Sequence, residues 1–165
     1  MCHFLKLNNI DNLIELSSFD SLAPQNTWGI YDDFLFEKTI NSINFNLNPR
    51  IDVYLTLTTH DPFEYPDEKK YVNQYKKLLN RHPEHPYINE GNIRKIASFL
   101  YLDNSIKKLF NLYKNKPNFD NTIFVITGDH NFNMQLDPLV LNNVPLIIWS
   151  PMLKKAKQFI YCWCV

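Results

Sequence analysis

The stretch that decides the fold is Thr-Ile-Phe-Val-Ile-Thr-Gly-Asp-His, residues 122–130. A short run of β-branched and aromatic residues ends at Gly128, and an acid and an imidazole follow directly as Asp129 and His130. Such an apolar run, bounded by turn signals, predicts a strand that is buried on both faces. Ligands of open α/β sheets bind beyond the carboxyl ends of the strands, so we expect a ligand beside Asp129 and His130. A carboxylate next to an imidazole suits a divalent metal such as zinc or manganese.

Size and charge narrow the class of protein. The 165 residues correspond to about one domain, and a hydrophobic share of 45% is enough for a core. Lys+Arg and Asp+Glu number 17 each, which argues against a general binder of nucleic acid or anionic membranes. The three cysteines lie near the two ends and give no disulfide framework. No run approaches the roughly 18–20 apolar residues of a membrane span, and the N-terminus has no signal-peptide layout. We therefore expect no export or anchoring device in the chain as given.

Other patterns supply the rest of the expected fold. Residues 51–59, Ile-Asp-Val-Tyr-Leu-Thr-Leu-Thr-Thr, predict a second strand, and residues 144–150 predict a third. Helical composition or periodicity marks three further segments, at residues 32–44, 68–80 and 92–114. The connections between strands are long enough for parallel crossovers. The predicted fold class is therefore α/β, with a partial, mostly parallel sheet flanked by helices.

Two details precede the first predicted helix. Gly29, one of only three glycines, follows Trp28 and indicates a close backbone approach or a special dihedral angle. Asp32 or Asp33 is placed to cap the helix that follows.

A second histidine stands at a strand end. The predicted strand 51–59 ends at His60, as the strand at 122–128 ends at Asp129 and His130. If the two strands are parallel neighbours, the three side chains converge on one crevice. The spacing alone leaves two interpretations open. The residues form a metal site, or the histidines merely end strands with ordinary hydrogen bonds.

Five segments occur in the order typical of one enzyme family. They are Trp-Gly-Ile-Tyr-Asp at 28–32, Leu-Thr-Thr-His-Asp-Pro-Phe at 57–63, Tyr-Leu-Asp at 101–103, Asn-Thr-Ile-Phe-Val-Ile-Thr-Gly-Asp-His at 121–130 and Val-Pro-Leu-Ile-Ile-Trp-Ser-Pro at 144–151. Together they resemble the sulfatase-like domain of lipoteichoic acid synthase and related phosphoglycerol transferases, in the alkaline phosphatase superfamily. The likeness covers residues 28–159, which would be the C-terminal part of such a domain. Residues 1–27 then form an N-terminal segment, and residues 160–165 an aberrant tail.

The resemblance implies roles for individual residues. The Asp-His pair of the family ligates a catalytic manganese or zinc ion, which puts this role on Asp129 and His130. The histidine at the end of the preceding strand faces the phosphate or sulfate of the substrate, which maps to His60. The tryptophan of the Trp-Gly motif lies near the pocket, which maps to Trp28. Asp103 matches a recurring acid on the long helix, and we interpret it as a structural carboxylate or one that supports the metal ligands.

The family mechanism also needs a nucleophile. In relatives a threonine, serine or formylglycine, together with a further acidic ligand, lies well before the Trp-Gly motif and becomes covalently modified. Only 27 residues precede Trp28, and none forms a recognisable nucleophile motif, with Thr27 adjacent to the motif rather than at the family position. We therefore expect no catalytic nucleophile in this chain and no esterase turnover. The alternative to an enzyme fragment is a catalytically dead remnant that at most binds a metal or an anion weakly.

The resemblance also suggests a setting. The substrate would be an anionic phospho- or sulfo-ester on a lipid or glycan, carrying phosphoglycerol, phosphoethanolamine or sulfate. Relatives are bacterial, with an extracytoplasmic catalytic domain held at the membrane by an anchor that this chain does not show. The tail at 160–165 reads as the product of a frameshift, so we expect a piece truncated at both ends, with exposed sheet edges and poor solubility.

Two weaker patterns stay open. His82 and His85 have a ligand-like spacing, but they lie between prolines in a polar loop, where solvated histidines are the simpler interpretation. Residues 162–165 have the outline of a prenylation box, although the middle residues are not aliphatic.

Overall fold

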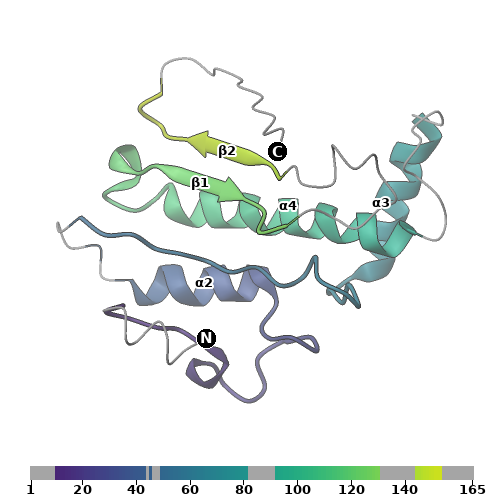
Figure 1. Cartoon of the computed structure of the whole chain (residues 1–165), viewed down its shortest axis with the longest axis horizontal. Helices are drawn as coiled ribbons and strands as arrows, with labels where there is room; N and C mark the ends of the chain where they lie inside the picture. Colours follow the sequence, from purple (N-terminus) through teal and green to yellow (C-terminus); the bar gives the residue numbers. More distant parts are fainter. Residues whose placement is uncertain (1–9, 44, 46–48, 82–91, 131–143, 154–165) are drawn as a thin grey trace, which may run out of the picture. The chain divides into compact units, whose positions relative to one another are not determined.

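The computed structural model describes residues 10–43, 45, 49–81, 92–130 and 144–153. Contacts within the chain divide it into two compact units, Met1–Tyr113 and Lys114–Val165, and each is described by itself. Figure 1 shows the helices of the first unit and the two strands of the second. His82, His85, the cysteines and the tail at 160–165 lie outside the described residues.

Three α-helices form the first unit. They are α2 (Asp32–Ser42), α3 (Glu68–Arg81) and α4 (Ile93–Tyr113), preceded by a short 3-10 turn, η1 (Leu16–Ser18). The three helices predicted from sequence are confirmed to within two residues at each end. Helix α4 packs against both α2 and α3. None of the helices among the described residues has the length and apolar character needed to cross a bilayer.

Tyrosines dominate the contact between α3 and α4. The buried cluster there consists of Tyr65, Tyr71, Tyr75, Ala97 and Tyr101. The rings of Tyr65 and Tyr101 stack with centroids 6.0 Å apart, and Tyr71 meets Tyr101 edge-on at 5.6 Å. Offset and edge-to-face pairs of this kind are favourable beyond the area they bury. On the other side of α4, Phe36 and Ile40 of α2 are fully buried.

The prediction of a strand at residues 51–59 is wrong for the part of the chain that the structure describes. No ladder forms between residues 51–59 and any other segment that the structure describes, and the segment runs as an unpaired tube beside α2 (Figure 1). Burial alternates only over residues 53–56, where Tyr54 packs edge-on against Phe36 at 5.5 Å. Residues 51–53 are all exposed, Ile51 at 90% and Val53 at 87%. A strand requires hydrogen bonds to a neighbouring backbone, and the apolar pattern of one segment does not say whether that neighbour is present.

The second unit contains the strand predicted at residues 122–128. Strand β1 (Phe124–Thr127) follows the 3-10 turn η3 (Phe119–Asn121) and pairs with β2 (Leu146–Trp149). Both strands lie where the sequence predicted them. Three aromatic rings pack at a tilt at one end of the strand pair. They belong to Phe119, Phe124 and Trp149, and their centroids are 5.6 to 6.2 Å apart.

Orientation and burial of this sheet differ from expectation. The strands are antiparallel, with Phe124 opposite Trp149 and Thr127 opposite Leu146, so a mostly parallel sheet is not confirmed. The predicted burial on both faces is also wrong for the described residues, because Val125 is 59% exposed and every residue of β2 is exposed. A short apolar run gives neither the direction of its partner nor what covers its faces, since both depend on the rest of the sheet.

Candidate functional site

A tight turn at residues 26–29 presents Trp28. The Asn26 side-chain oxygen accepts hydrogen bonds from the backbone N–H groups of Trp28 and Gly29, both at 2.9 Å. Gly29 has φ of +158°, and a Cβ there would lie 3.3 Å from a methyl carbon of Leu57. A side chain at this position would be strained in φ and crowded against Leu57. Both features expected of Gly29, the special dihedral and the close approach, are confirmed.

Trp28 and His60 are brought together, although they are 32 positions apart in sequence. Their ring centroids are 4.5 Å apart with planes at 63°, an edge-to-face contact. The indole N–H of Trp28 donates to the backbone carbonyl of Asp61, and His60 Nδ1 lies 2.8 Å from the same oxygen. Both side chains are exposed, so the pair forms a surface site rather than part of the core.

Hydrogen bonds to Glu64 join this turn to the segment that carries His60. Its carboxylate accepts hydrogen bonds from the backbone N–H of Thr27 at 2.8 Å and from the Thr27 hydroxyl at 2.7 Å. These two hydrogen bonds lower the pKa of the Glu64 carboxyl. Sequence reasoning missed Glu64, because nothing in a loop of this composition indicates a partner 37 residues away.

Asp32 holds the segment 51–59 against α2. The expectation that it caps the helix is wrong, because Tyr31 occupies the cap position and makes no side-chain cap hydrogen bond. The Asp32 side chain is instead completely buried, and Oδ1 accepts a hydrogen bond from Leu57 N–H at 3.0 Å. Burial raises the pKa of the Asp32 carboxyl, against the opposite effects of the Thr58 hydroxyl and of backbone N–H groups. Within the described part of the chain, Asp32 Oδ2 and the Thr58 hydroxyl oxygen have no hydrogen-bond partner of good geometry.

Asp33, the neighbour of Asp32, joins α2 to α4. Its Oδ1 accepts a hydrogen bond of 2.6 Å from the Tyr101 hydroxyl, and burial together with Asp33 raises the pKa of Tyr101 strongly. Lys108 forms an ion pair of 2.7 Å with Glu37 and one of 3.5 Å with Asp33. Asp103 lies exposed on α4, and its role as a structural carboxylate or a support of the metal ligands stays a prediction.

Asp129 and His130 lie in the second unit, directly after β1. Their side chains are 76% and 73% exposed, and Asp129 Oδ1 accepts a hydrogen bond from His130 N–H at 2.9 Å. Gly128 before them fits closely, because a Cβ there would lie 3.2 Å from the His130 carbonyl oxygen. Among the described residues, no group of three or more His, Cys, Asp or Glu side chains is arranged to hold a metal ion. The carboxylate and the imidazole are thus two ligand-type groups of a site that usually has four.

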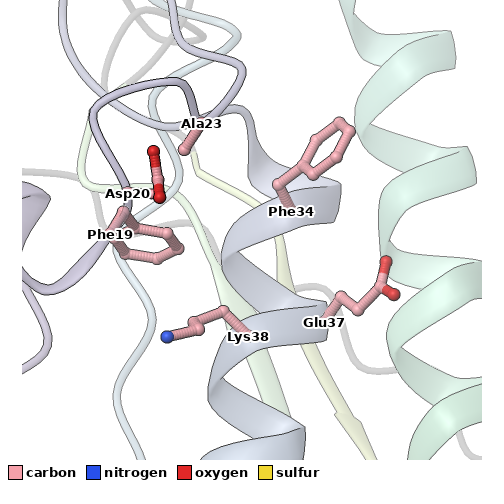
Figure 2. Close-up of a pocket in the computed structure, with 6 residues that line it drawn as sticks. All are labelled: Phe19, Asp20, Ala23, Phe34, Glu37 and Lys38. Carbon is pink, nitrogen blue, oxygen red and sulfur yellow. The ribbon is translucent and has the colours of Figure 1, made fainter.

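A hollow of about 260 Å³ lies beside α2 in the first unit (Figure 2). It is lined by Phe19, Asp20, Ala23, Phe34, Glu37 and Lys38. The charged groups around it already have partners within the chain: Lys38 lies over the ring of Phe19, and Lys108 lies over Phe34 while pairing with Glu37. None of the site residues predicted from sequence lines this hollow.

Comparison with known proteins identifies the family. The model of the Sulfatase family matches residues 1–160 of this chain. The chain belongs to the sulfatase family. Domains of this family generally use a divalent metal, and the assignment of Asp129 and His130 as its ligands stays a prediction.

A solved structure supports the fold of this sulfatase-family chain. It is that of a protein in the alkaline phosphatase superfamily from Vibrio parahaemolyticus, with a TM-score of 0.62 and 21% sequence identity. The match covers 87% of this chain but 33% of the other, so the sulfatase-family chain spans about a third of that protein's length. The α/β fold of the alkaline phosphatase superfamily is therefore confirmed.

Proposed function

We propose that this chain is part of a metal-dependent enzyme of the lipoteichoic acid synthase type, acting on an anionic phospho- or sulfo-ester of a lipid or glycan. The observation that carries the proposal is the Asp129–His130 pair. Two exposed side chains of metal-ligand type follow directly on β1 in a chain of the sulfatase family. A carboxylate and an imidazole suit manganese or zinc.

Each residue has a distinct part in this proposal. Asp129 and His130 hold the metal, which, when bound, activates a nucleophile and neutralises charge on the transferring group. His60 contacts the phosphate or sulfate, and Trp28 lies against its ring at 4.5 Å. The nucleophile and a further acidic ligand of the proposed enzyme come from outside the residues described above.

The second candidate is a non-catalytic remnant that binds a metal or an anion weakly. The lack of a recognisable nucleophile motif in the sequence favours it for the chain by itself. Hydrolysis or transfer of an ester is expected of the enzyme and not of the remnant, so turnover distinguishes the two candidates. Metal binding is expected of both.

Metal binding to the chain tests the assignment of Asp129. Mn²⁺ is titrated into the protein and followed by the loss of the electron paramagnetic resonance signal of the free ion. We expect saturable binding that Asp129→Asn weakens by roughly tenfold or more, the range known for changes at and around metal ligands. Asp120→Asn is the matched control, since Asp120 is an exposed carboxylate of the same unit in η3. Equal binding by wild type and Asp129→Asn would refute the assignment.

A further inference from the structure

The hydrogen bond of the His60 ring determines which of its nitrogens carries the proton. His60 Nδ1 lies 2.8 Å from the carbonyl oxygen of Asp61. A carbonyl oxygen only accepts hydrogen bonds, so Nδ1 must be the donor. In a neutral imidazole the other nitrogen, Nε2, then carries a lone pair and no hydrogen. The tautomer of a functional histidine is commonly set in this way by a backbone carbonyl.

Trp28 fixes the same carbonyl from the other side. Its indole N–H donates to the Asp61 oxygen, and the edge-to-face contact places the indole against the His60 ring. One oxygen thus accepts from both aromatic side chains, which uses the two lone pairs of a carbonyl. Any movement of Trp28 would therefore change both the ring contact and the acceptor on which the tautomer depends.

The position of Trp28 is itself held by hydrogen bonds to both segments. Asn26 Oδ1 accepts from the Trp28 backbone N–H, and Thr27 donates two hydrogen bonds to the Glu64 carboxylate. The Asn26 side-chain amide also donates to the Glu64 backbone carbonyl at 3.3 Å. The turn that presents Trp28 and the segment that presents His60 are therefore joined by three hydrogen bonds to Glu64.

We propose that Trp28 is a positioning residue that acts through His60. Together with the Asp61 carbonyl it holds His60 in the tautomer with hydrogen on Nδ1, and leaves Nε2 as the nitrogen that meets an oxygen of the anionic phospho- or sulfo-ester. The substrate part of this inference rests on the proposed function, whereas the tautomer does not. When the ring is an imidazolium, with hydrogen on both nitrogens, Nε2 donates a hydrogen bond to the ester oxygen while Nδ1 keeps its bond to the Asp61 carbonyl. This role is more specific than the position near the pocket that the resemblance implied for Trp28.

Nuclear magnetic resonance of the imidazole nitrogens tests the proposal without any ester or metal. The protein is labelled with ¹⁵N-histidine, and long-range ¹H–¹⁵N correlations are recorded at about pH 8.5, where an ordinary imidazole is neutral. The His60 signals are assigned by their loss in His60→Gln. We expect the pattern of the tautomer with hydrogen on Nδ1 in the wild type. In Trp28→Phe, which keeps an aromatic ring but loses the N–H donor, we expect a shift toward the tautomer with hydrogen on Nε2.

Tyr75→Phe is the matched control, because Tyr75 lies in the buried cluster between α3 and α4 of the same unit. It should leave the His60 pattern unchanged. A wild-type pattern with hydrogen on Nε2, or an unchanged pattern in a folded Trp28→Phe, would overturn the proposal. If Trp28→Phe does not fold, the wild-type tautomer alone decides. Failure of the Mn²⁺ experiment would count against the proposed function and leave this result standing.

Discussion

The buried Asp32 carboxylate accepts a hydrogen bond from Leu57 N–H at 3.0 Å, and this hydrogen bond joins α2 to the segment that leads to His60. Asp32 lies four positions after Trp28, and Leu57 three positions before His60. The two sides of the Trp28–His60 contact are thus connected a second time, through the interior of the first unit. This connection gives the first prediction.

Replacing Asp32 by alanine should destabilise the first unit by about 1–3 kcal/mol, because Leu57 N–H then loses its acceptor in a buried position. Asp32→Asn should not do so, because the amide keeps an acceptor oxygen and can donate to the Thr58 hydroxyl oxygen. Burial raises the pKa of Asp32 in the folded state, so its stabilising contribution is complete below the unfolded pKa and is lost as pH rises through the folded pKa. As the pH rises from roughly 4 to 7, the wild type should therefore lose stability that Asp32→Asn keeps, so the difference shifts in favour of the variant.

Urea unfolding of the three proteins at both pH values measures these differences. An Asp32→Asn variant as unstable as Asp32→Ala at pH 7 would show that the carboxylate charge itself is required there.

A second prediction concerns the tyrosine cluster at high pH. The Tyr65 hydroxyl donates to the Arg94 carbonyl at 3.0 Å, and burial raises its pKa to about 12. The unfolded chain releases this proton near pH 10, so the contribution of Tyr65 to stability is complete below about pH 10 and is lost as the pH rises to 12. Tyr65→Phe should be less stable than wild type by about 0.5–1.5 kcal/mol at neutral pH, and the gap should narrow above pH 10. Thermal unfolding at a series of pH values checks this, and a gap that stays constant up to pH 12 would contradict it.

The exposed side chains of the unpaired segment should limit solubility. Ile51 and Val53 are 90% and 87% exposed, on a segment whose backbone has no ladder partner among the described residues. Such segments are templates for association between chains. The double change Ile51→Thr with Val53→Thr should raise the soluble fraction and leave the free energy of unfolding within about 0.5 kcal/mol of wild type.

Ile40→Thr is the matched control for this pair, because Ile40 is completely buried in α2. It should instead destabilise the protein by roughly 2–4 kcal/mol, through a lost apolar contact and a buried hydroxyl. If the double variant aggregates as readily as wild type in light-scattering measurements, the exposed segment is not the cause.

The chain alone should hydrolyse no ester, because it shows no nucleophile motif of the family. The test uses p-nitrophenyl phosphate and p-nitrophenyl sulfate with added Mn²⁺ or Zn²⁺. We expect rates equal to those of the buffer with metal. Hydrolysis that a chelator abolishes and that Asp129→Asn lacks would contradict this prediction, and would favour the enzyme over the remnant.

Local patterns determined which elements form and where. The periodicity of apolar residues gave the three helices to within two residues, because it reports one face of a helix in a short window. The apolar run before Gly128 predicted the position of β1, and the order of the motifs indicated a sulfatase-like domain. The adjacency of Asp129 and His130 follows from the chain itself and needs no fold to establish it.

The tertiary structure alone decided which distant residues meet. It paired β1 antiparallel to β2 and buried the Asp32 side chain instead of using it as a helix cap. Among the described residues, it gave residues 51–59 no strand partner. It also set the Trp28 indole and the His60 ring on one carbonyl oxygen. The physical reason is the same in each case. Propensity and periodicity act within about ten residues, whereas most of these contacts join residues roughly 20 or more positions apart and form only once the chain is packed.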